Sequence, residues 1–233
     1  MNHTNLFHFF KKGLPLFSLL SLALSFWSCN PISSKPSELI DWIPQNSSWV
    51  IQINDGNTLT SELTNNEVFK EIKLLNNELT TDISGLLSGT PDIESLLCVT
   101  KVGKNPGALT HIYKAPLDST LMNGPSIEYS KVQINIEKRA TKVLYSSNIS
   151  GYTLRSTSQL LIENCIRTSQ QKSTSNTTKL FKTIYFTLDT GAPINILVQP
   201  KVEELIETMI GQTPLMPKVS HDWNAYDLNF EES

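Results

Sequence analysis

Polar and hydrophobic residues alternate in several short stretches of this chain, and each stretch predicts a β-strand. The first is residues 49–54, where Ile51 and Ile53 fall on one side of an extended backbone. The same pattern predicts strands at residues 95–102, 108–114, 130–139, 142–147, 151–156, 194–198 and within 218–231. Polar, glycine-containing turns at residues 55–57 and 103–107 separate neighbouring elements.

Other stretches space their hydrophobic residues three or four positions apart, which is typical of helices with one buried side. Residues 68–83 follow this pattern after Asn65 or Asn66, either of which can serve as the N-cap. Residues 38–44 predict a short helical turn that ends at Pro44. Residues 180–188 are apolar and fit a helix or a strand.

Two more helices are predicted in the second half of the chain. One follows Thr157 or Ser158 and has a predicted buried side of Leu160, Leu161, Cys165 and Ile166. The other opens at Pro200, runs through residues 202–210 and stops at Gly211. Residues 169–178 between them are polar and predict a loop.

Strands and helices in this order predict an α+β fold, an antiparallel sheet with a few packed amphipathic helices. Residues 49–63 and 194–210 both run from a strand through a polar turn into a helix. Two similar halves are therefore one option for the globular body, which we assign to residues 38–233. A body that is incomplete at its C-terminus is another.

The N-terminal residues predict export. Lys11 and Lys12 precede an apolar run over residues 14–27, which has the layout of a secretory signal and is short for a membrane span. Cys29 directly follows Ser28, as in a bacterial lipobox where the cysteine is acylated. Phe26 stands where leucine is usual. We assign residues 1–28 to a lipoprotein signal peptide; the alternative is an ordinary signal peptide with Cys29 an incidental thiol.

Residues 29–37 form the lipidated cysteine and a tether. The part after Cys29 contains two prolines and reaches at most about 26 Å. No acidic residue occurs before Glu38, whereas surface-exported lipoproteins of the Bacteroidota carry an acidic tract there. We therefore expect a lipid-anchored protein of the bacterial envelope, on the periplasm-facing side of the outer membrane.

The net charge bears on the class of partner, and the cysteine positions bear on whether a disulfide forms. The chain carries 19 Lys and Arg against 22 Asp and Glu, a net charge of −3, with no basic stripe for phosphate backbones. Nucleic acid is therefore not an expected partner. Cys98 and Cys165 lie in apolar patterns, so buried thiols are favoured over a disulfide between them.

The chain resembles a family of uncharacterised Bacteroidota envelope lipoproteins. In these proteins a short shared segment follows the lipidated cysteine. The residues of this chain that match that segment are Ile43, Pro44, Asn46, Val50, Ile53, Asn54 and Asp55. Residues 154–167 and 223–233 add to the resemblance. It implies an envelope lipoprotein and supplies no catalytic residue; members are often longer, so the chain ending at Ser233 fits a truncated product.

One short motif points to chemistry. Residues 186–197 contain Asp189-Thr190-Gly191 after apolar residues, the signature of retropepsin-like aspartic peptidases, which pair two such aspartates across a dimer. The second element that these enzymes need is missing, since Met209-Ile210-Gly211 comes early and in a helical pattern. A polar turn between two apolar segments is the favoured interpretation, with Asp189 kept as a weak catalytic candidate.

The remaining polar residues form no recognisable site. His111 lies in a strand pattern, and His221 and Asp222 are neighbours whose side chains point apart in a strand. No spacing indicates a metal or a cofactor. Packing is favoured over a ligand cleft for Trp42, Trp49, Trp223 and Tyr226.

The sequence therefore favours a non-enzymatic binding or scaffold protein held to the bilayer through acylated Cys29. Its partner is an unknown protein or glycan. The alternative function is the aspartic peptidase.

Overall fold

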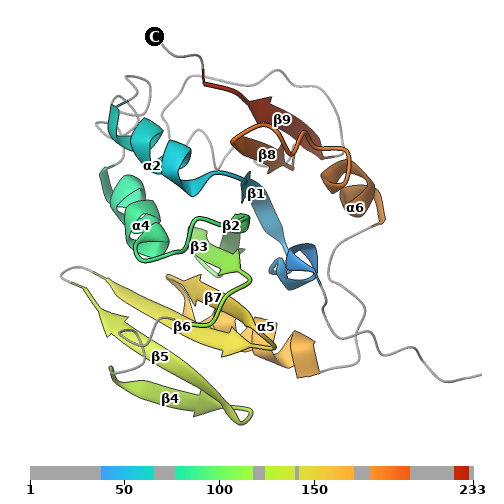
Figure 1. Cartoon of the computed structure of the whole chain (residues 1–233). Coiled ribbons are helices and arrows are strands. Elements are labelled where there is room, and N and C mark those ends of the chain that lie inside the picture. Colours follow the sequence, from blue (N-terminus) through green and yellow to red (C-terminus); the bar gives the residue numbers. More distant parts are fainter. Residues whose placement is uncertain are drawn as a thin grey trace, which may run out of the picture. The chain divides into compact units, whose positions relative to one another are not determined.

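An antiparallel sheet of nine strands organises the part of the chain that the structure describes, in the order β4-β5-β6-β7-β3-β2-β1-β8-β9 (Figure 1). The computed structural model describes residues 38–65, 77–117, 124–139, 142–170, 179–199 and 223–230. All of them belong to one compact unit, Lys35–Ser233. The α+β prediction is confirmed.

Most of the predicted strands are present, although their ends differ by a few residues. The strands are β1 (Ser47–Ile53), β2 (Ser95–Val102), β3 (Asn105–Tyr113), β4 (Ser126–Tyr129), β5 (Val132–Lys138), β6 (Val143–Ile149), β7 (Tyr152–Ser156), β8 (Ile194–Val198) and β9 (Asn224–Leu228). The helical elements are the 3₁₀ turn η1 (Leu39–Trp42) and the helices α2 (Gly56–Asn65), α4 (Asn77–Leu87), α5 (Gln159–Gln170) and α6 (Lys179–Tyr185).

Helices cover both faces of the sheet. On one face η1, α5 and α6 pack against strand residues that include Val50, Leu96, Ile112 and Leu154. On the other face α2 and α4 pack against Ile53, Leu97, Val99 and Leu109. Figure 1 shows α2 and α4 on one side of β1–β3, and η1 and α6 on the other. The central strand β2 is therefore buried at every position from 95 to 100.

The predicted turn at residues 55–57 is wrong, because helix α2 begins there. The carboxylate of Asp55 accepts a hydrogen bond from the Thr58 backbone N–H at 3.0 Å and from the Thr58 hydroxyl at 2.7 Å. Asp55 thus caps the helix in the way that aspartate favours. The same residue types, Asp and Gly, are common in turns and at helix starts, and the sequence pattern did not separate the two.

A second correction concerns the hairpin before β5. The strand predicted over residues 130–139 instead has a turn at its start, where Ser130 has φ 49° and Lys131 has φ 66°. Two successive positive φ angles make the tight hairpin turn that suits strand twist. The preceding residues pair with β5 as the short edge strand β4, which was not predicted.

Helix α5 is confirmed, but one residue of its predicted buried side is wrong. Leu160 is 52% exposed, whereas Ile162 is fully buried. The buried stripe is Leu161, Ile162, Cys165 and Ile166. Successive residues of a helix are rotated by about 100°, so a stripe centred between 162 and 165 leaves position 160 on its outer side.

Some predictions fall outside the described residues. They include the helix predicted over residues 202–210 and the first part of the helix predicted over residues 68–83. Both remain predictions. The later part of the first helix is seen as α4. For the ambiguous residues 180–188, the structure shows helix α6.

A buried arginine joins helix α4 to the sheet. Arg155 of β7 is 1% exposed, and its guanidinium donates hydrogen bonds to the backbone carbonyls of Leu86 at 2.6 Å, Ser88 at 2.7 Å and Gly85 at 3.2 Å. These carbonyls lie at the C-terminal end of α4, where a helix leaves its acceptors without intrahelical donors. Glu137 adds a carboxylate 3.5 Å from the guanidinium. Arg155 therefore caps α4 from the core.

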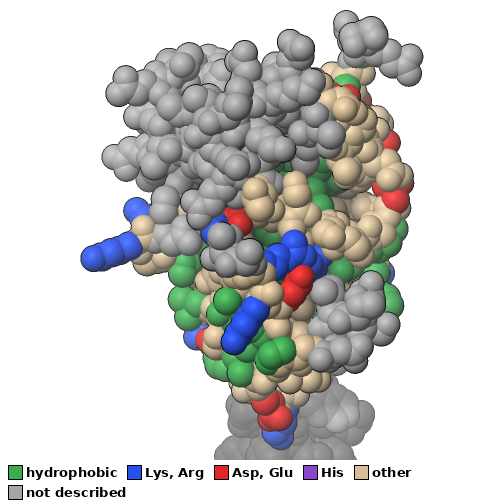
Figure 2. Space-filling model, turned by 90° about the vertical axis from the view of Figure 1, so that its left-hand side faces the viewer, with side chains coloured by type: hydrophobic (Ala, Val, Ile, Leu, Met, Phe, Trp, Pro, Cys, Tyr) green, Lys and Arg blue, Asp and Glu red, His purple; other side chains and the backbone are tan. Residues whose placement is uncertain are grey.

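Ion pairs also lie at the surface near α4. Lys142 pairs with Asp82 of α4, and Arg139 pairs with Glu137 at 2.8 Å. On the side of the molecule that carries α4, cationic and acidic side chains lie close together among hydrophobic and polar ones (Figure 2). Partly exposed pairs of this kind contribute less stability than the buried arginine.

We expect Arg155→Met to destabilise the fold strongly. The variant keeps the side-chain volume but leaves the α4 carbonyls buried without a donor, which costs about 3 kcal/mol in the free energy of unfolding. Urea denaturation measures this loss. Arg167→Met is the matched control, because Arg167 is exposed at the far end of α5 and contacts Asn164. A loss below about 1 kcal/mol for Arg155→Met would contradict the capping role.

Candidate functional site

A cleft with a volume of about 410 Å³ opens beside the sheet, on the face covered by η1 and α6. A volume of this size fits a small ligand or a few side chains of a partner. Residues from η1, the ends of three strands and α6 line it: Glu38, Leu39, Ile40, Ile93, Glu94, Lys114, Tyr152, Tyr185 and Phe186.

Strand register brings the polar residues of this cleft together. Ser95 of β2 pairs with Tyr113 of β3, and Tyr113 pairs with Thr153 of β7. One step further toward the same end of the sheet come Glu94, Lys114 and Tyr152, one from each of three neighbouring strands or their extensions. Because side chains alternate along a strand, these residues fall on the same face as Leu96, Ile112 and Leu154.

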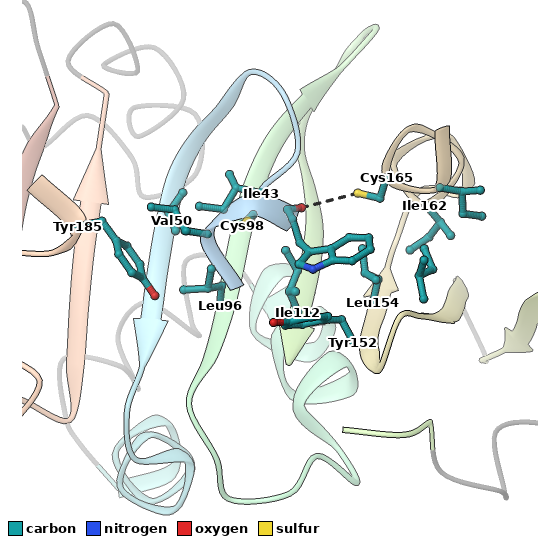
Figure 3. Packing of buried hydrophobic residues seen from close by; sticks show 14 of the residues in the cluster. Ile43, Val50, Leu96, Cys98, Ile112, Tyr152, Leu154, Ile162, Cys165 and Tyr185 are labelled. Carbon is teal, nitrogen blue, oxygen red and sulfur yellow. Dashed lines mark hydrogen bonds between the residues drawn. The ribbon is translucent and has the colours of Figure 1, made fainter. Parts of the chain in front are cut away.

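The other wall comes from the two helical segments that cover this face. Ile40 of η1 is buried in the core, and Tyr185 at the end of α6 lies in the same apolar cluster. Figure 3 shows Tyr185 and Tyr152 on either side of Leu96, which belongs to the core behind the cleft. Phe186 follows α6 and is 63% exposed. An exposed phenylalanine at the opening provides apolar surface to a ligand.

Glu94 is a charged group of the cleft that accepts two hydrogen bonds from neighbouring side chains. Its Oε1 accepts hydrogen bonds from Gln52 Nε2 at 2.9 Å and from the Tyr185 hydroxyl at 3.0 Å. Gln52 itself is only 3% exposed, and its Oε1 has no donor among the described residues. The cleft therefore has a carboxylate that two hydrogen bonds hold, one of them from a buried glutamine that does not itself line the cleft.

The cation of the cleft is Lys114, whose Nζ lies 5.8 Å from the centre of the Tyr152 ring. A cation at this distance over an aromatic face is attracted by the negative charge of the ring's π system. No carboxylate in the described part of the chain lies within ion-pair distance of this ammonium group.

Both tyrosines stay neutral in this environment. Burial raises the pKa of Tyr185, and the nearby negative charge of Glu94 raises it further. Burial also raises the pKa of Tyr152, with Asp41 and Glu38 adding their charges. Burial and the nearby carboxylates thus both favour the neutral form of these hydroxyls, in which each can donate a hydrogen bond.

This arrangement is suited to recognition. The lining residues include two carboxylates, one ammonium group and three aromatic rings, but no cysteine, serine or histidine that could act as a nucleophile or base. Within the described ranges no group of three or more His, Cys, Asp and Glu residues could hold a metal ion. None of the helices described there is long and apolar enough to cross a bilayer.

The Asp189 motif forms a self-contained turn. The Asp189 carboxylate accepts the Gly191 backbone N–H at 2.8 Å, and the Asp189 carbonyl accepts the Ala192 N–H at 3.2 Å. Asn195 donates to the Asp189 carbonyl at 3.0 Å and to the carboxylate of Asp227 at 2.6 Å. Asp189 therefore fixes the chain between α6 and β8, as the polar-turn interpretation expects.

The thiols and indoles lie mainly in the core. Cys98 and Cys165 are free and buried, and burial raises the pKa of Cys165 to about 12. Cys165 lies 3.8 Å from the Trp42 carbonyl oxygen (Figure 3). Trp42 packs on Tyr152 with ring centres 5.3 Å apart, and Trp223 packs edge-on against Phe181. Packing is thus confirmed for these two tryptophans.

Other residues singled out from the sequence are not brought to the cleft. Cys29, His221 and the Met209-Ile210-Gly211 segment lie outside the described residues. His111 is buried on the opposite face of the sheet, beside Arg155 in the pairing of β3 with β7. The residues that form the cleft were not predicted as a site. Glu94, Lys114 and Tyr152 are far apart in sequence, and only strand register, which was not predicted, brings them together.

Comparison with known proteins adds no family. No protein-family model and no curated protein matches this chain. A solved structure described as "Structure of crystal form IV of TP0453" matches with a TM-score of 0.45 and 8% sequence identity, over 80% of this chain and 73% of that chain. We take neither ligand nor activity from a similarity at this level.

Acid is expected to destabilise the fold through His111. Burial and the charge of Arg155 lower the pKa of this imidazole from 6.5 to about 3. Between these values the unfolded chain binds a proton that the folded chain does not. Stability therefore falls as pH falls, by up to about 1.4 kcal/mol per pH unit.

Urea denaturation of the wild type and of His111→Leu at pH 7, 6 and 5 tests this expectation. The variant should show a flatter dependence, because it lacks the titrating ring. An unchanged slope in the variant would show that other groups cause the effect.

The turn around Asp189 predicts a different outcome for two substitutions. Asp189→Asn keeps an oxygen for the Gly191 N–H and should change stability by less than about 0.5 kcal/mol. Asp189→Ala removes that acceptor and should cost about 1 kcal/mol. Thermal unfolding measures both. If peptide hydrolysis by the wild type were lost in Asp189→Asn with stability unchanged, Asp189 would be catalytic.

Proposed function

We propose that this chain is a lipid-anchored protein of the bacterial cell envelope whose folded body binds a ligand without transforming it. The single observation that carries the binding role is the cleft lined by Glu38, Glu94, Lys114, Tyr185 and Phe186. It combines apolar surface with a few fixed polar groups, which is the usual composition of a ligand site.

The support for anchoring comes from the N-terminal sequence. A cationic start, an apolar run and Cys29 after a small residue have the layout of a lipoprotein signal. Membership of the Bacteroidota lipoprotein family that the chain resembles is part of the same proposal. So is a position on the periplasm-facing side of the outer membrane.

The spacing between anchor and cleft is short. Glu38 lines the cleft and follows Cys29 by nine positions in the sequence. A chain of that length spans at most about 30 Å. An acylated Cys29 would therefore keep the ligand site close to the membrane, where a partner protein or glycan of the envelope is accessible.

The peptidase alternative has less support. Catalysis of that kind needs a carboxylate that is free to share a proton with a second carboxylate and to activate water. The Asp189 carboxylate instead accepts the N–H of Gly191 in its own turn. Within the cleft, Glu94 Oε1 is already bonded to Gln52 and Tyr185.

We expect the native protein from the membrane fraction to begin at Cys29 and to carry acyl chains on that residue. Intact-mass spectrometry after detergent extraction measures this. Cys29→Ser should lose the acyl mass and leave the membrane fraction or retain its signal, because the acylated thiol is absent. Cys98→Ala serves as the matched control and should keep the lipid. Wild-type protein without lipid, or Cys29→Ser protein with it, would overturn the anchoring proposal.

A further inference from the structure

We infer that the cleft recognises an organic cation, an ammonium or guanidinium group carried on an apolar body. This inference rests on the proposed binding role of the same cleft and names the chemistry of its ligand. Three independent features of the described residues lead to it: the excess of acceptors, the position of Lys114 and the apolar wall.

The first feature is the balance of charge and hydrogen-bonding groups. Glu38 and Glu94 place two negative charges in the cleft against the single positive charge of Lys114. Gln52, which is 3% exposed and does not line the cleft, holds Glu94 Oε1 by a hydrogen bond from its Nε2 at 2.9 Å. The cleft therefore carries a net negative charge, which favours a ligand that is a cation and brings N–H donors.

The second feature is the cation that already occupies the cleft. The Lys114 ammonium lies over the Tyr152 ring at 5.8 Å, which shows that the face of this ring accepts an alkylammonium group. Lys114 is exposed and lies one residue beyond the end of β3, so its long side chain can move aside. A ligand cation would take over the interaction that Lys114 makes with the Tyr152 ring.

The third feature is the apolar wall beside these charges. Leu39, Ile93 and the ring of Phe186 line the same cleft. Phe186 is 63% exposed, and covering an aromatic ring of this kind releases surface water at a favourable free energy. A bare metal cation would leave this wall uncovered, whereas a cation attached to a hydrocarbon or aromatic group would fill it.

The ligand class excludes anionic partners for the same reasons. A carboxylate or phosphate placed here would meet Glu38 and Glu94 and would find one lysine to balance it. Like charges at short distance in a partly buried site are unfavourable. The geometry therefore favours amines over acids of equal size.

The test compares three small molecules that share a phenyl ring and a short chain: phenethylamine, 2-phenylethanol and phenylacetate. The detergent-solubilised full chain is titrated with each by isothermal calorimetry. We expect phenethylamine to bind at least ten times more tightly than 2-phenylethanol and phenylacetate to bind most weakly. The difference between the amine and the alcohol isolates the effect of the positive charge.

Substitutions then assign the interaction to the cleft. Glu94→Gln keeps an oxygen for Tyr185 but removes the charge, and it should weaken phenethylamine binding about tenfold. Lys114→Met should strengthen it several-fold, because the competing ammonium is gone. Glu128→Gln is the control, since Glu128 is an exposed residue on the edge strand β4 and should have no effect.

Four outcomes would overturn the inference. If phenylacetate binds as tightly as the amine, or if Glu94→Gln leaves amine binding unchanged, the cleft does not select cations. If 2-phenylethanol binds as well as the amine and Phe186→Ala abolishes both, the cation inference fails and the binding role of the cleft remains. If none of the three binds, the cation inference fails together with the proposed role of the cleft.

The same chemistry could come from a free amine or from a basic side chain of a protein. A capped peptide containing Phe-Lys, with its Nε-acetylated form as the control, separates these sources. Tighter binding of the peptide than of phenethylamine, lost on acetylation, identifies a protein segment as the natural source. Tighter binding of phenethylamine than of the peptide identifies a small amine.

Discussion

The requirement to cover both faces of the central strands determines this structure. β2 is buried from residue 95 to residue 100, so helical segments must pack on each side of it. Helices α2 and α4 cover one face, while η1, α5 and α6 cover the other. The cleft lies where η1 and α6, on the second face, meet the ends of β2, β3 and β7. Its polar residues are those that follow the buried strands toward solvent.

The two covers are held in different ways. Helix α4 is attached by a charged group, since the Arg155 guanidinium binds its last carbonyls and Glu137 lies beside it. The η1 and α6 cover is attached mainly by apolar packing, including Ile40, Trp42, Phe181 and Tyr185. A hydrogen bond from Tyr185 to Glu94 also links α6 to the sheet. Glu94 thus serves both the packing of this cover and the electronegative character of the cleft.

The sequence allowed most of the fold to be predicted, because hydrophobic periodicity reports which side of an element is buried. Prediction from the sequence failed at two positions where the pattern allowed two interpretations. Asp55-Gly56 was interpreted as a turn, although Asp55 caps α2, and Leu160 was placed in the core, although the buried stripe of α5 is centred elsewhere. The cleft was not predicted, because Glu94, Lys114 and Tyr152 become neighbours only through strand register. Periodicity within a strand carries no information about register between strands.

The central claim is that the cleft at the end of β2, β3 and β7 is the ligand site, and methyl NMR of the full chain during a phenethylamine titration tests it most directly. The account predicts shift changes concentrated at Leu39, Ile40 and Ile93, which line the cleft. Methyl signals of Leu144 and Leu109, which belong to the apolar layer on the opposite face, should stay in place. Changes confined to that opposite layer, or no saturable change at the cleft, would contradict the account.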